Sequence, residues 1–275
     1  MGMISTKPFS LPLILLFTTI FLMLLKRVNS SDALSFSYNE FELDEQNLIF
    51  QGDAHITSMP SFTGNVLQLT KTYSKGAPQR NTVGRVLFST PFRLYIKGAD
   101  RVSNFESNIN IVLTKPSTRP ADGLAFFIAP IGSTIPKHSN GGYLGLFDKT
   151  AASFDSTANP VVVAVEFDTY HNPWDPKYAH IGINVNSINS SAHVKWERKE
   201  GEVFNVRIAY NALFRNLSVV SHYSGGENYT LSYLVDLPSV LPEWVNVGIT
   251  AASGRQVQVH SIISWSFNSG LETIA

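Results

Sequence analysis

The sequence has no cysteine among its 275 residues, which excludes disulfide bonds and zinc–thiolate sites. A metal ion would have to be held by oxygen and imidazole ligands, a set that suits Ca²⁺, Mg²⁺ or Mn²⁺. Charged residues make up only 15% of the chain and form no basic stripe, which argues against a nucleic acid partner. Segments with helical periodicity are also lacking, and "LPSVLPEW" (237–244) predicts at most one short turn.

One long apolar run is present, at residues 11–25, between Lys7 and the small polar segment "VNSSD". This order is typical of a cleaved secretory signal peptide, and the run is shorter than the roughly 20 residues that span a bilayer. We assign 1–30 to the signal peptide and 31–275 to a single domain. The alternative, an uncleaved signal anchor, draws support from Lys26 and Arg27 after the run.

A secreted protein free of the membrane after cleavage is therefore expected, outside the cell or in the vacuole. Three N-glycosylation sequons agree with export, because their acceptors are modified only in the secretory pathway. The acceptors are Asn189, Asn216 and Asn228.

Short segments with period-two alternation recur along the rest of the chain, separated by turns rich in glycine, proline and asparagine. They lie at 34–41, 65–70, 83–89, 104–113, 203–211, 213–223, 229–237 and 262–267. The segments 123–130 and 160–168 are more continuously apolar and predict central strands buried on both faces. The pattern predicts an all-β sandwich of two antiparallel sheets.

The stretch "EFDTYHNPWDPKYAH", residues 166–180, concentrates groups that bind cations. On a strand, Glu166, Asp168 and Tyr170 would share one face because side chains alternate. The turn at the two prolines that follow would bring Asn172 and Asp175 back toward them, and His180 would head the next strand.

These groups suit two ions. Ca²⁺ would take Asp168, Asn172, Asp175 and a backbone carbonyl. A transition ion such as Mn²⁺ would take Glu166, Asp168, Asp175 and His180. No Lys or Arg lies between 161 and 176 to neutralise the carboxylates. The alternatives are a solvated acidic loop and a glycoside hydrolase that uses Glu166 and Asp168, although the further Glu that such strands carry is missing.

Six motifs, in order along the chain, resemble the legume lectin family: "LIFQGDA", "ADGLAFFIAP", "GGYLGLF", "VAVEFDTYHNPWDPKYAHIGINVNSI", "LPEWVNVGITAASG" and "SWSF". The resemblance implies a jelly-roll sandwich that binds glycans without catalysis, with Ca²⁺ and Mn²⁺ beside the sugar pocket. It implies the same two ligand sets, with the carbonyl of Tyr170 as the backbone ligand for calcium. Ser190 matches a serine that holds a manganese-bound water.

The resemblance also implies the sugar pocket. Asp122, after a cis peptide bond to Ala121, would accept two sugar hydroxyls. Gly142 would donate a backbone N–H, Asn172 would donate to the sugar as well as bind calcium, and Tyr170 would support the apolar face of the ring.

Nine residues separate Gly254 from Ser264, a loop length that resembles mannose/glucose-binding members. The backbone N–H groups of Arg255 and Gln256 would meet the sugar there, although a long charged side chain at Arg255 is a departure from the family. A galactose-binding lectin and a lectin-like defence or storage protein without sugar activity are the alternatives. We expect a homodimer or homotetramer, because exposed sheet edges favour pairing across a two-fold axis.

Overall fold

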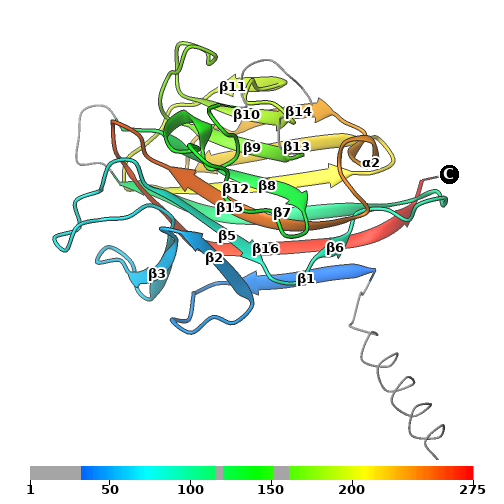
Figure 1. Ribbon diagram of the computed structural model, residues 1–275, viewed down its shortest axis with the longest axis horizontal. Coiled ribbons are helices and arrows are strands. Elements are labelled where there is room, and N and C mark those ends of the chain that lie inside the picture. Colours follow the sequence, from blue (N-terminus) through cyan, green and yellow to red (C-terminus); the bar gives the residue numbers. More distant parts are fainter. Residues whose placement is uncertain (1–31, 115–119, 151–160, 275) are drawn as a thin grey trace, which may run out of the picture. The chain divides into compact units, whose positions relative to one another are not determined.

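The computed structural model describes residues 32–114, 120–150 and 161–274 (Figure 1). The signal peptide assigned to residues 1–30 lies outside this range. Within the described residues, no helix is long and apolar enough to cross a membrane.

Among the described residues, eight strands form the first sheet, called here the back sheet, and all of its pairings are antiparallel. Their order is β14–β13–β12–β7–β16–β4–β3, and β1 also pairs with β16. The strands are β1 (Ala33–Tyr38), β3 (His55–Ser58), β4 (Asn65–Gln68), β7 (Arg101–Thr114), β12 (Val203–Asn211), β13 (Asn216–Tyr223), β14 (Tyr229–Leu234) and β16 (Val259–Thr273).

A second antiparallel sheet, the front sheet, also has eight strands within the described part of the chain, in the order β11–β10–β9–β8–β15–β5–β2, with β6 beside β15. Figure 1 shows it lying over the back sheet. The strands are β2 (Leu48–Gly52), β5 (Val83–Phe88), β6 (Phe92–Arg93), β8 (Gly123–Pro130), β9 (Val163–Asp168), β10 (His180–Val185), β11 (Ala192–Lys195) and β15 (Trp244–Ala252). The all-β sandwich predicted from the alternation is confirmed.

The main core lies between the sheets, where the inward residues of both alternate with outward ones. A second, smaller apolar cluster covers the opposite face of the front sheet. It joins Ala125, Phe127 and Ala164 of the central strands to Leu146 and Phe147 of a loop. This loop explains why β8 and β9 are buried on both faces, as their continuous apolar sequences predict.

Alternation gave the bounds of β12, and the continuous apolar run gave those of β8. The two longest strands, β7 and β16, extend beyond the predicted segments at both ends. The expected strand at 213–223 is shorter, because residues 212–215 form the hairpin turn and Arg215 adopts a φ of 50°. The short strands β2, β3, β6 and β11 were not predicted from alternation, since two to five residues give too few repeats of the pattern.

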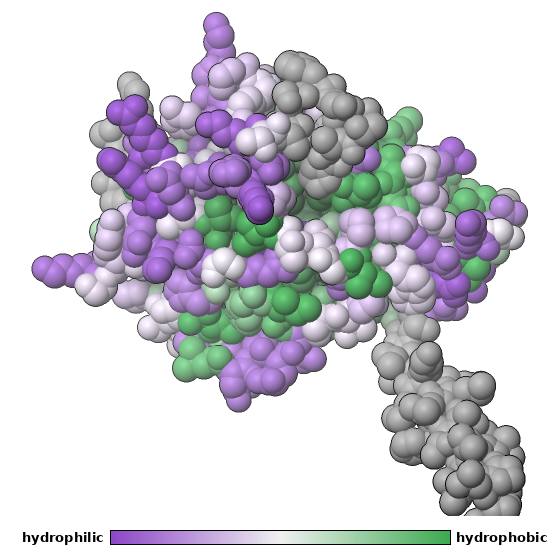
Figure 2. Space-filling model, viewed as in Figure 1, coloured by the Kyte–Doolittle hydropathy of each residue, from purple (hydrophilic) through white to green (hydrophobic). Residues whose placement is uncertain are grey.

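Helical structure is as scarce as the sequence predicts. Within the described residues it consists of one 3₁₀ turn, η1 (Gly141–Tyr143), and one short helix, α2 (Leu237–Val240). The α2 helix falls inside "LPSVLPEW". In the space-filling view, apolar residues form separate patches among polar ones rather than a continuous surface (Figure 2).

Candidate functional site

Loops from distant parts of the chain meet over one hollow of about 670 Å³. They are the residues before β8, the η1 turn, the turn after β9 and the loop after β15. All of the predicted sugar-contacting residues lie in its wall. The lining residues are Asn81, Asp122, Asn140, Gly141, Gly142, Tyr143, Lys149, Tyr170, Asn172, Trp174, Gly254, Arg255 and Gln256.

Asp122 is the carboxylate of the hollow. It directly precedes β8, and the Ala121–Asp122 peptide bond is cis, as the resemblance implies. The side chain is only 5% exposed, and its Oδ2 atom has no hydrogen-bond partner among the described residues. Burial, with a further contribution from the charge of Asp175, raises the pKa of Asp122 to about 7, although the backbone N–H of Gly254 opposes the shift. Asp122 therefore brings a carboxyl group with an unsatisfied acceptor atom to the wall of the hollow.

Gly142 packs directly against Asn172. A Cβ atom at Gly142 would lie 2.6 Å from Cγ of Asn172, closer than real side chains approach. The resemblance implies a glycine here because a side chain would block the close approach of a sugar. The structure adds a second reason, since the glycine leaves room for the amide of Asn172 itself.

The turn after β9 is organised by two carboxylates. Asp168 Oδ1 accepts the backbone N–H of Tyr170 at 2.7 Å, and Asp175 Oδ2 accepts that of Asn172 at 2.8 Å. Such local bonds compete with strand pairing. The strand therefore ends at Asp168, and the prediction that Tyr170 continues its face is wrong. Tyr170 nevertheless lines the hollow from the turn.

The predicted transition-ion ligands also come together. His180 on β10 lies opposite Asp168 on β9 in the sheet register, and its Nε2 atom is 3.1 Å from Oε1 of Glu166. The hydroxyl of Ser190 contacts the same Glu166 oxygen. Glu166, Asp168 and His180 are all buried.

The electrostatics of this cluster favour a cation. Burial, followed by the negative charges of Asp175, Glu166 and Asp122, raises the pKa of Asp168 well above its ordinary range. Burial also raises the pKa of Asp175. Oδ2 of Asp168 is buried without a hydrogen-bond partner among the described residues. A buried, mutually repelling set of carboxylates is costly unless positive charge joins it.

As they stand, no three His, Asp or Glu side chains within the described residues are arranged to hold a metal ion. His180 and Ser190 instead hydrogen-bond Glu166, and Asp168 and Asp175 bond the backbone of their own turn. The donor chemistry still fits a hard cation and a mixed-ligand cation. Binding would require these side chains to exchange their present hydrogen bonds for the ion.

Several residues of the hollow were not predicted. The rings of Tyr143 and Trp174 lie 5.1 Å apart at 47°, which gives the hollow an aromatic wall beside Tyr170. Asn140 donates to Asn81 at 3.1 Å on the rim. Both aromatics lie inside the quoted motifs, "GGYLGLF" and "NPWDP", so their sequence position was a usable signal. Asn81 carried none, since it lies in an ordinary turn segment.

The three sequons occupy different surroundings. Asn189 lies in the exposed turn between β10 and β11, and Asn228 lies in the exposed turn before β14. Asn216 is half-buried as the first residue of β13.

Comparison with known proteins places these features in a family. Residues 33–274 match the legume lectin domain. The chain is 50% identical to Agglutinin-2 of Cladrastis kentukea over 273 residues, covering 98% of this chain and 92% of the relative. It is 51% identical to the mannose/glucose-specific lectin of Centrolobium tomentosum over 245 residues, covering 88% and 97% of the two chains.

A solved structure agrees. The basic winged bean lectin with Tn-antigen superimposes with a TM-score of 0.79 at 38% identity, covering 87% of this chain and 99% of that one. The fold is therefore the legume lectin fold, and the hydrolase alternative is excluded, because the family consists of carbohydrate-binding proteins without enzymatic activity. The chain belongs to the legume lectin family and is a carbohydrate-binding protein.

Proposed function

We propose that this protein is a lectin that binds mannose/glucose-type glycans and requires Ca²⁺ and Mn²⁺. One observation carries the proposal. Asp122, Gly142 and Asn172 come from three separate segments and line a single hollow, which adjoins buried carboxylates that lack a countercharge.

The hollow supplies what a sugar ring needs. The carboxylate of Asp122 would accept hydrogen bonds from two sugar hydroxyls, while the side-chain amide of Asn172 and the backbone N–H of Gly142 would donate hydrogen bonds to the sugar. Tyr170, with the Tyr143 and Trp174 pair, offers apolar surface to the C–H face of the ring. A few fixed polar groups and an aromatic wall give orientation with modest affinity.

The metals would be held beside the hollow by two overlapping sets of ligands. Asp168, the carbonyl of Tyr170, Asn172 and Asp175 would hold Ca²⁺. Glu166, Asp168, Asp175 and His180 would hold Mn²⁺. The ions would supply the missing positive charge, which favours the ionised form of Asp122. They would also fix the amide of Asn172 before the sugar arrives.

The sugar preference rests on the loop after β15 and on the relatives. This loop is short, and Arg255 and Gln256 line the hollow. The side chain of Arg255 is exposed, so the departure from the family at this position is compatible with a backbone contact to the sugar. Relatives at 48 to 51% identity are named mannose/glucose-specific, mannose-specific and α-methyl-mannoside-specific lectins.

The test is calorimetric titration of methyl α-mannoside and of galactose into metal-loaded and chelated protein, with Asp122→Asn as the inactive control. We expect mannoside to bind only the metal-loaded wild type. Binding that survives chelation would overturn the metal requirement. Absence of any binding would favour the alternative that the protein is a lectin-like defence or storage protein without sugar activity.

Galactose is the second candidate because a similar structure, 39% identical, is a lectin complexed with galactose. Metal-dependent binding of galactose alone would show that the residues of the loop after β15, rather than the length of this loop, determine the sugar preference.

We also propose that residues 1–30 are removed on export and that the mature protein is a secreted or vacuolar homo-oligomer. Amino-terminal sequencing of the exported protein should begin at Ser31. A protein that still carries the leader would support the signal-anchor alternative.

A further inference from the structure

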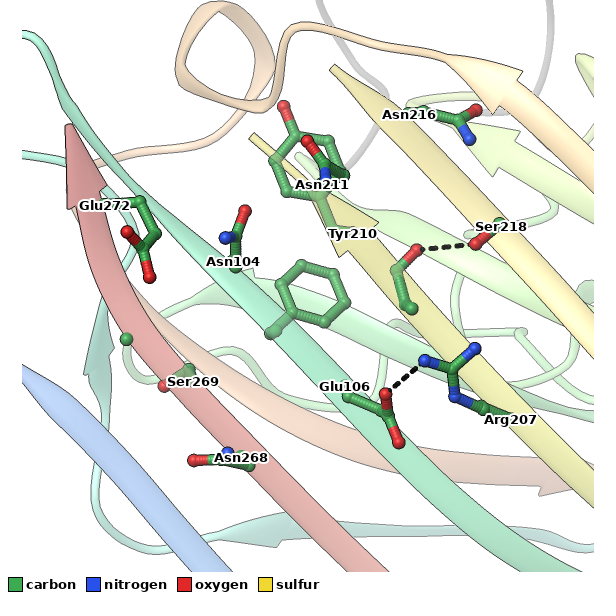
Figure 3. Close-up of a pocket in the computed structure, with 13 residues that line it drawn as sticks. Asn104, Glu106, Arg207, Tyr210, Asn211, Asn216, Ser218, Asn268, Ser269 and Glu272 are labelled. Atoms are coloured by element: carbon green, nitrogen blue, oxygen red, sulfur yellow. Dashed lines mark hydrogen bonds and ion pairs between the residues drawn. The ribbon is translucent and has the colours of Figure 1, made fainter. Parts of the chain in front are cut away.

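The outer face of the back sheet carries a second hollow, which shares no lining residue with the hollow of the sugar site. It is a shallow groove of about 410 Å³ (Figure 3). It crosses β13, β12, β7 and β16. Its lining residues are Asn104, Phe105, Glu106, Arg207, Ala209, Tyr210, Asn211, Asn216, Ser218, Asn268, Ser269, Gly270 and Glu272.

The groove exists because two short residues stand in rows of longer ones. One row runs Ser218–Ala209–Glu106–Asn268 across the four strands, with Ala209 as its smallest side chain. In the neighbouring row, Asn104 on β7 lies opposite Gly270 on β16. Side chains in a row share one face of the sheet, so a residue with little side chain leaves a depression.

The lining is dominated by amides and hydroxyls. Its central charged pair is Glu106 with Arg207, joined at 2.5 Å, and Asn108 donates to the other oxygen of Glu106. In Figure 3 the amides of Asn104, Asn211, Asn216 and Asn268 lie above this pair and to its left. Such a surface offers donors and acceptors in comparable numbers, which suits the hydroxyl and acetamido groups of a sugar.

Asn216 connects this groove to glycosylation. It is itself a lining residue, and Asn216-Leu217-Ser218 is a sequon whose middle residue is not proline. The residue that pairs with it on β12 is Asn211, which is also part of the lining. A glycan joined to the amide of Asn216 therefore begins inside the groove. The acceptors Asn189 and Asn228 lie in exposed turns and line none of the described hollows.

Exposed apolar side chains border the same acceptor. Leu234 on β14 lies opposite Asn216 in the register and is 72% exposed. In the adjoining turn, Phe214 is 68% exposed and Leu213 is 59% exposed. Apolar groups gathered beside a polar groove indicate a surface that something covers. The C–H faces of a sugar chain rooted at Asn216 are suited to covering them.

We propose that the groove holds the first N-acetylglucosamine residues of an N-linked glycan on Asn216, so that the protein covers its own back sheet. This goes beyond the sugar-binding function and depends only on export. Attachment forms a bond from Nδ2 of Asn216 to C1 of the sugar. It breaks the bond from C1 to a lipid diphosphate donor, and the amide proton leaves with the diphosphate. The transfer occurs on the nascent chain, before β13 pairs.

The test uses secreted full-length protein carrying high-mannose glycans and an endoglycosidase that cuts between the first two N-acetylglucosamine residues. Glycopeptide mass spectrometry follows cleavage at Asn216 and Asn228 under native conditions. A docked glycan must leave the groove before it is cut, so we expect cleavage at Asn216 to be about tenfold slower. Equal rates, or an unmodified Asn216, would overturn the proposal.

Filling the groove tests its role directly. In Ala209→Leu the larger side chain occupies the depression, and cleavage at Asn216 should become as fast as at Asn228. Asn205→Leu, on β12 of the same sheet and outside the groove, should leave the slow rate unchanged. Asn268→Phe is a second filling variant should Ala209→Leu fail to be secreted. Cleavage that stays slow in the filling variants would overturn the proposal. A change in the molar mass of the glycosylated protein on groove filling would overturn it as well. Either result would indicate that a second copy, rather than the glycan, covers this face.

Discussion

Gly142 illustrates how one hydrogen atom in place of a side chain can determine binding. Its position allows the amide of Asn172 to reach the hollow, and a Cβ atom there would overlap that amide. In Gly142→Ala, Asn172 must therefore shift. Overpacking of this kind costs about 1–3 kcal/mol, so we expect methyl α-mannoside to bind at least about tenfold more weakly in calorimetry.

The matched control is Gly270→Ala on the back sheet, where a Cβ atom meets nothing within 4 Å. Its affinity for the mannoside should equal that of the wild type. Unchanged affinity in Gly142→Ala would show that Asn172 does not need its present position to bind sugar.

His260 gives the molecule a pH dependence that is independent of the sugar site. It is fully buried, and burial, with a contribution from the charge of Arg198, lowers its pKa to about 3. The unfolded chain takes up a proton at this histidine below pH 6.5, whereas the folded chain does not. Stability contributed by His260 is therefore present above pH 6.5 and is lost as the pH falls toward 3.

We expect this histidine to remove about 3 kcal/mol of stability between pH 7 and pH 4. Urea unfolding of wild type and His260→Gln at both pH values measures it, since the variant should lose that much less on acidification. The buried carboxyls with raised pKa act in the opposite direction but are common to both proteins. His222→Gln, on the outer face of β13, is the control, and identical losses in all three proteins would refute the expectation.

At the scale of elements, β9 and β10 place the proposed metal ligands at their paired ends. Asp168 lies opposite His180 in the register, and the turn between the strands carries Asn172 and Asp175. Removing divalent ions would leave these carboxylates buried and repelling. An ion present at 100 times its dissociation constant contributes about 2.7 kcal/mol to stability, so we expect chelation to lower the melting temperature.

Hydrogen exchange locates the effect of chelation. Amides of β9, β10 and their connecting turn should exchange faster in the chelated protein, while those of β12 and β7 in the back sheet should not. A melting temperature and exchange pattern unaffected by chelation would show that the carboxylate cluster is stable without ions.

The limits of sequence-based prediction also appear at the scale of elements. β12 alternates buried and exposed residues over its whole length, so its bounds follow from the sequence. Tyr170 could not be placed correctly, because the hydrogen bond from its backbone N–H to Asp168 ends the strand. The alternation of polar and apolar residues carries no information about such bonds.

Residues of the site could be predicted from the sequence where the type of side chain itself indicates the function. Asp122, Asn172 and the carboxylates predicted to bind metal stood out in short motifs, and the structure brings them together. The back-sheet groove was not predictable. It arises from the register of Ala209 and Gly270 with residues on strands more than fifty positions away, which no local pattern encodes.

At the scale of the whole molecule, the free edges of the back sheet determine how copies can associate. Within the described residues, β1 pairs only with β16, and β14 pairs only with β13. The edge at β14 lies beside two glycosylation sequons, Asn216 and Asn228. Bulky glycans there would oppose strand pairing. Of the remaining edges in the described part of the chain, β3 pairs only with β4 and has four residues, so the six-residue β1 offers a second copy the longer open edge.

We therefore expect the homo-oligomer to use β1, paired with its counterpart across a two-fold axis. Ser35 and Ser37 are exposed on this strand, and in such a pair their counterparts lie near one another. Ser35→Lys combined with Ser37→Lys places like charges there and should halve the molar mass measured by light scattering, with mannoside affinity per site unchanged. The control is Ser232→Lys with Leu234→Lys on β14, which leaves both sequons intact and should keep the wild-type mass. If the β14 variant dissociates and the β1 variant does not, the glycans leave the β14 edge open and the copies pair there instead.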